Sequence, residues 1–136
     1  MKKPLLTAFV ASLVMFTLSG LYTGVIARGF IASHVDQALL RLPPNLAMTY
    51  LGYLFLAFVM SFTYTHFVKS VSRPAITGLK FGFFSAVFWL MPYSVVLFSV
   101  YNFPYSALPL DFGWALVEQG LGGLVIGVIY GKRQHV

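Results

Sequence analysis

The chain has 136 residues, of which 59% are hydrophobic and 9% charged, with a net charge of +6 and no cysteine. Charge this sparse excludes a soluble globular protein, whose water-exposed surface needs about 25% charged residues. The lack of cysteine excludes disulfides, thiolate metal sites and a cysteine nucleophile. We therefore expect a single all-α integral membrane domain over residues 1–136.

Four apolar runs are long enough for membrane helices, each of which needs roughly 20 apolar residues. In chain order they cover about 4–27, 46–68, 81–101 and 109–130. Backbone groups in lipid must be bonded within their own segment, and the runs lack the alternation of barrel strands. We expect a four-transmembrane-helix bundle.

The first run follows Lys2 and Lys3, like the start of a secretory signal, and Val25-Ile26-Ala27 has the form of a weak cleavage site. The run covers about 24 residues, whereas the apolar region of a signal covers 7–15. We therefore expect an uncleaved first helix.

The loop over 28–45 has an amphipathic pattern. One helical face carries its apolar residues, which are Ile31, Val35, Ala38, Leu39 and Leu42. Pro43-Pro44 ends this pattern. We expect a short amphipathic helix in this first outer loop, which either lies on the membrane, docks onto a partner or covers the protein's own bundle.

Lysine and arginine set the expected orientation, because they gather on the cytoplasmic side of membrane proteins. The first loop holds Arg28 and Arg41, and the third loop holds neither lysine nor arginine. The termini and the second loop hold seven: Lys2, Lys3, Lys69, Arg73, Lys80, Lys132 and Arg133. We expect both termini in the cytoplasm. These positions at the ends of apolar runs argue against a nucleic-acid partner, which needs a basic solvated face.

Glu118 is the only formally charged residue deep within a run, about nine residues and roughly 13 Å into the fourth span. An unpaired carboxylate there costs several kcal/mol, so we expect it to be neutral or paired. Pro92 should kink the third span at a similar depth. This places Tyr93, Tyr53 and Gln119 as candidate hydrogen-bond partners in a ligand site, a proton step or a structural contact.

Glycines at four-residue spacing let helices approach closely. They are Gly20 and Gly24 in the first span, Gly78 and Gly82 at the third, and Gly123, Gly127 and Gly131 in the fourth, where Gly120 shares their side. This face lies roughly opposite Glu118, so the fourth helix has two faces that need protein neighbours. We expect the glycine face to meet another subunit, in a homo-oligomer or a larger complex; packing within one monomer is the alternative.

No serine has a histidine and an acid at its depth, so we expect no catalytic triad. No spacing of histidine and acidic residues predicts a metal site. A bis-histidine haem needs two imidazoles at one depth, which only a dimer using His66 twice would supply. We expect no metal and no cofactor.

The run from Gly120 to Gly131 resembles the last span of small, uncharacterised four-helix bacterial inner-membrane protein families, and the run from Gly78 to Phe84 resembles the opening of their third span. Those families often place a histidine where this chain has Glu118-Gln119. The resemblance implies topology and bacterial origin.

Three functions follow as hypotheses. The first is a non-catalytic or accessory subunit of a membrane assembly. The second is a small transporter or proton-conducting oligomer that uses Glu118. The third is an intramembrane protein that binds lipid, quinone or haem.

Overall fold

The computed structural model describes residues 2–68 and 72–131. All regular structure in this part of the chain is helical. Four helical segments are long and apolar enough to cross a membrane: Pro4–Ile26, Leu46–Phe67, Pro74–Val100 and Tyr105–Gly131. The prediction of an all-helical chain with four such segments is confirmed. Lys69, Lys132 and Arg133, which contributed to the predicted orientation, lie outside the described residues.

The segments are built from α-helices and short π and 3₁₀ turns. In chain order these are α1 (Lys2–Leu21), η1 (π, Tyr22–Ile26), α2 (Arg28–His34), η2 (3₁₀, Gln37–Leu39), α3 (Leu46–Phe67), α4 (Pro74–Ser85), η3 (π, Ala86–Leu90), α5 (Met91–Val100), η4 (3₁₀, Tyr105–Ala107) and α6 (Leu108–Gly131).

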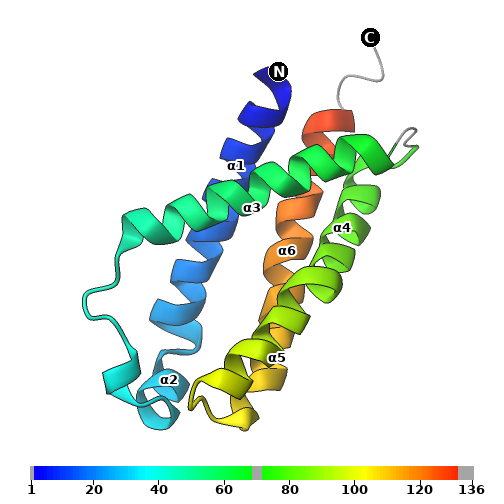
Figure 1. Cartoon of the computed structure of the whole chain (residues 1–136). Helices are drawn as coiled ribbons and strands as arrows, with labels where there is room; N and C mark the ends of the chain where they lie inside the picture. Colours follow the sequence, from blue (N-terminus) through cyan, green and yellow to red (C-terminus); the bar gives the residue numbers. More distant parts are fainter. Residues whose placement is uncertain (1, 69–71, 132–136) are drawn as a thin grey trace.

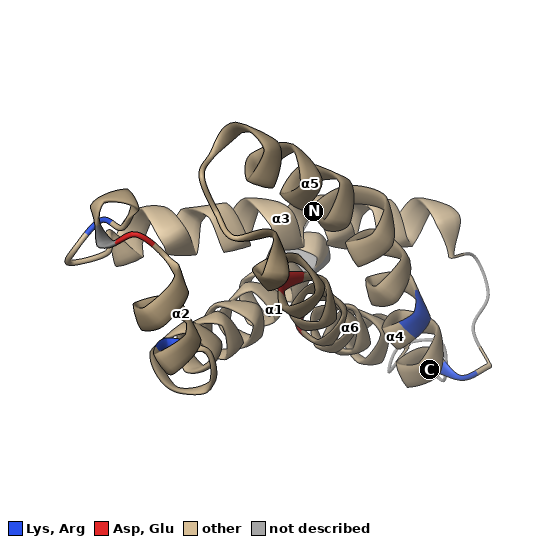
Figure 2. Cartoon of the chain, turned by 90° about the horizontal axis from the view of Figure 1, so that it is seen from below, with Lys and Arg blue, Asp and Glu red and all other residues tan. Residues whose placement is uncertain are grey.

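Helix α6 is central to the bundle, because it packs against α4 on one side and α1 on another. Helix α3 packs mainly on α1 and crosses the other long segments obliquely (Figure 1). The start of α1 and the end of α6 lie at the same end of the bundle (Figure 1). The sparse charged residues lie mostly in loops and near helix ends (Figure 2).

The contact between α4 and α6 is made by glycine. A Cβ built at Gly78 would lie 2.8 Å from the Cα of Gly127, and one at Gly123 would lie 2.6 Å from the backbone nitrogen of Gly82. Real Cβ atoms do not approach this closely, so the two backbones touch only because both helices lack side chains here. The tandem glycine face of α6 is therefore filled by α4 of the same chain. The expectation that this face meets another subunit loses its basis, because no room remains on it.

On its other side α6 joins α1 and α3 in an apolar core. The buried members of this core are Ala8, Ala11, Met15, Ala57, Met60, Tyr64 and Ile126. Small residues are frequent in α1 and α3, so these two helices pack closely. Met15 of α1 and Ile126 of α6 are completely buried in this core.

The first loop differs from the predicted single amphipathic helix. Helix α2 ends at His34, and the backbone of Val35 is extended. The Asp36 carboxylate then accepts a hydrogen bond from the backbone nitrogen of Ala38 at 2.9 Å, a local turn that competes with helix formation. The placement of this loop at a membrane surface stays a prediction.

The third span begins at Pro74, not at residue 81 as predicted. Proline suits the first helical position, where its missing N–H costs nothing, so Lys80 lies within α4 and not in a loop. The predicted irregularity near Pro92 takes the form of the π-turn η3, in which the backbone nitrogen of Met91 donates to the carbonyl of Ala86.

Replacing Gly123 with alanine should destabilise the fold by about 1–3 kcal/mol, because the new methyl group meets the Gly82 backbone. Gly122→Ala is the matched control. Its methyl group would meet the Met15 side chain, which can rotate away. Denaturant titration in micelles, followed by circular dichroism, measures both; equal losses would contradict the account of the α4–α6 contact.

Candidate functional site

Glu118 lies in the middle of α6, is 5% exposed and is turned toward α1 and α3. Its Oε2 accepts hydrogen bonds from the Tyr53 hydroxyl of α3 at 3.0 Å and from Nε1 of Trp114, one turn earlier in α6, at 3.2 Å. Nε2 of Gln119 lies 3.4 Å from the other carboxyl oxygen. The carboxyl is thus bonded by three polar side chains, which fits the rule that buried polar groups find partners.

Further contacts fix these partners in place. The Trp114 ring stacks on Tyr22 of η1, with 4.4 Å between ring centroids and 9° between planes. The Tyr53 ring packs edge-on against Phe16 of α1, with 6.2 Å between ring centroids. The cluster around Glu118 therefore links the first, second and fourth spans.

Gln119 is fully buried and only partly satisfied. Its Nε2 lies 3.6 Å from the Met15 sulfur, a weak acceptor, while its Oε1 has no hydrogen-bond partner in the described part of the chain. Turning the amide by 180° would present Oε1 to Glu118. A neutral Glu118 would then donate a hydrogen bond to Oε1, so this pair accommodates the uncharged form of the carboxyl.

The structure brings together Glu118, Gln119 and Tyr53, three of the four predicted site residues. Tyr93 lies apart from them: it is 57% exposed and faces a groove between α3 and α5. The π-turn η3 precedes it and changes the direction of the residues that follow. Trp114 is a further partner outside the four predicted site residues, although helical periodicity places it on the face of Glu118, four residues earlier.

A second polar cluster lies near the ends of α1 and α6. The Ser61 hydroxyl lies 3.2 Å from the Tyr130 hydroxyl and 3.4 Å from the Pro4 carbonyl oxygen. Met15 and Ile126, both 0% exposed, belong to the apolar core, and the polar side chains of Thr7 and Ser12 are also fully buried.

Within residues 2–68 and 72–131, no group of three or more histidine, cysteine, aspartate or glutamate residues could hold a metal ion. The ring of His66 lies against Phe62 of its own helix, with its Nδ1 2.9 Å from the Phe62 carbonyl oxygen.

Comparison of the chain with protein-family models, with curated proteins and with solved structures gives no match. The arguments on function therefore start from the geometry above.

Tyr53→Phe should reduce the free energy of unfolding by about 0.6 and at most about 1.7 kcal/mol, the range for hydrogen bonds between membrane helices. Tyr93→Phe is the matched control, because Tyr93 makes no side-chain hydrogen bond in the described chain. This variant should leave the free energy of unfolding unchanged. Denaturant titration measures both variants. An equal effect at the two tyrosines would show that the bond to Glu118 contributes no stability.

Proposed function

We propose that this protein is a non-catalytic accessory subunit of a membrane assembly. The observation that carries the proposal is the open small-residue face at Gly20 and Gly24. A Cβ at either position would have no atom within 4 Å in the described chain. Glycine costs a helix about 1 kcal/mol relative to alanine, and in α4 and α6 close packing offsets that cost. At Gly20 and Gly24 no such packing exists within the chain, so the approach of another helix would supply it.

The arrangement around Glu118 supports a structural role for the polar cluster. Tyr53, Trp114 and Gln119 hold the carboxyl from two helices, and the cluster ties α6 to α1 and α3. A carboxyl used in this way fixes the relative rotation of helices, which a subunit needs in order to present a constant surface.

We also propose the bacterial inner membrane as the location, with both ends of the chain in the cytoplasm. The support is the sequence count of seven basic residues on one side and two on the other. The partner in the assembly is a second copy of the chain or another membrane subunit.

A second candidate function is proton transfer through Glu118. A carboxyl near mid-span with a tyrosine hydroxyl on one oxygen has the groups that a proton step requires. The hydrogen bonds of Glu118 and those of the Tyr130 hydroxyl share no partner in the described residues, so conduction would require a second subunit or a rearrangement of the core.

Gly20→Leu should remove the chain from its assembly while leaving its own fold intact, because the new side chain fills the face a partner would approach. A clash of about 1.4 kcal/mol or more lowers the assembled fraction roughly tenfold. Gly113→Leu is the matched control, since Gly113 is equally open but has no second glycine four residues away. Native gel electrophoresis of gently extracted membranes reads the outcome; full assembly of the Gly20 variant would contradict the proposal.

Glu118→Gln separates the two candidate functions. Glutamine keeps the size of the side chain and an acceptor for Tyr53, so assembly should be unchanged. A proton carrier, however, would lose its pH-driven flux in liposomes, because an amide does not release a proton near neutral pH. We expect wild type and variant to give the same flux; loss of a measurable flux in the variant would favour the second candidate.

A further inference from the structure

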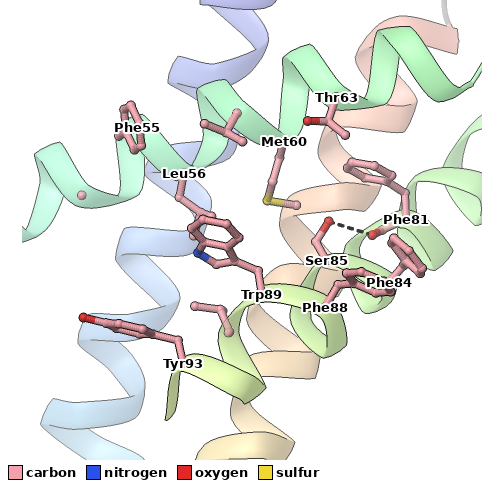
Figure 3. Close-up of a pocket in the computed structure, with 13 residues that line it drawn as sticks. Phe55, Leu56, Met60, Thr63, Phe81, Phe84, Ser85, Phe88, Trp89 and Tyr93 are labelled. Atoms are coloured by element: carbon pink, nitrogen blue, oxygen red, sulfur yellow. Dashed lines mark hydrogen bonds between the residues drawn. The ribbon is translucent and has the colours of Figure 1, made fainter. Parts of the chain in front are cut away.

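An apolar groove of about 540 Å³ lies between α3 and the segment α4–η3–α5 (Figure 3). Its walls carry no charged residue. Six of the lining residues are aromatic: Phe55, Phe81, Phe84, Phe88, Trp89 and Tyr93. The groove is separate from the Glu118 cluster and from the open face at Gly20.

The groove arises from the oblique path of α3, which contacts α4 at few positions while it packs along α1 (Figure 1). The π-turn η3 shapes the opposite wall. A π-turn closes its hydrogen-bonded ring with one residue more than an α-turn. Trp89 lies within this turn and Tyr93 follows it. The extra residue rotates both side chains back to the side of Phe81 and Ser85, and all four residues line the groove.

The wall chemistry argues against a helix as the occupant. Helices associate in lipid through small residues and shared hydrogen bonds, because lipid tails solvate large apolar side chains equally well. The contact of α4 with α6 follows this rule, but the groove presents Phe55, Phe88 and Trp89, which are 70%, 70% and 68% exposed.

A slender flexible hydrocarbon chain does not meet this obstacle, because it associates with large apolar side chains without needing small residues or shared hydrogen bonds. The volume lies within the range of about 300–1,000 Å³ typical of sites for a single small ligand. The Ser85 hydroxyl within the groove donates to the Phe81 carbonyl at 3.0 Å, and the lining as a whole is predominantly apolar. The groove thus suits a hydrocarbon tail, with the head group outside.

We propose that the groove between α3 and α4–η3–α5 binds one acyl chain of a membrane phospholipid. The bound chain fills the wedge between α3 and α5 and keeps α3 in its oblique position. The groove is not the face at Gly20 and Gly24 that the proposed assembly uses. Lipid binding and assembly can therefore be tested, and can fail, independently.

The test is native mass spectrometry of the delipidated protein in detergent, titrated with palmitoyl-oleoyl phosphatidylglycerol. We expect a single-lipid adduct that saturates at one lipid per chain. Gly52→Trp should lower its occupancy at least about tenfold, equivalent to 1.4 kcal/mol, because Gly52 lines the groove and has open space at its Cβ. Gly113→Trp, also open but outside this groove, should retain the adduct.

Val59→Trp provides a second blocking variant from the same wall, so that misfolding of one variant does not decide the result. Thermal unfolding verifies the fold of each. Three outcomes would each overturn the proposal. They are lipid binding that does not saturate, equal lipid binding by the wild type and both blocked variants, and preferential binding of a prenyl quinone offered at equal concentration.

Discussion

The close contact between α4 and α6 is the constraint on which the rest of the bundle depends. Gly78 and Gly82 meet Gly123 and Gly127 with their backbones touching, a geometry that any larger side chain would break. Because this contact fixes one face of α6, the opposite face, with Glu118 and Gly122, is turned toward α1 and α3. A run of glycines thus determines where the carboxyl lies.

The Glu118 cluster then joins the second half of the bundle to this frame. The Tyr53 hydroxyl of α3 donates to the carboxyl, and Trp114, a second donor, is held by its stacking on Tyr22 of η1. Burial of a carboxyl in a membrane helix is costly unless it is hydrogen-bonded or neutral. The first condition is met here, since Tyr53, Trp114 and Gln119 donate hydrogen bonds to it.

Sequence periodicity predicted the four spans and the two faces of α6, because hydropathy and helical spacing are local properties. What covers each face depends on helix rotation and crossing angle, which are not local. The glycine face was therefore assigned to another subunit, whereas α4 fills it. The sequence places Tyr93 near Glu118, because the π-turn that precedes Tyr93 has no sequence signal. The sequence also predicts a third span that starts after Lys80, because a charged residue is typical of a loop, whereas the helix begins at Pro74. Trp114 was detectable from its spacing to Glu118.

The chain forms a complete bundle on its own, and we propose that it meets a partner through a different face. Native mass spectrometry of the protein extracted gently from its own membrane tests this most directly. We predict a species heavier than the 15.1 kDa chain, containing a second copy or another polypeptide. A bare monomer, intact and without any polypeptide partner under conditions that preserve known membrane complexes, would contradict it.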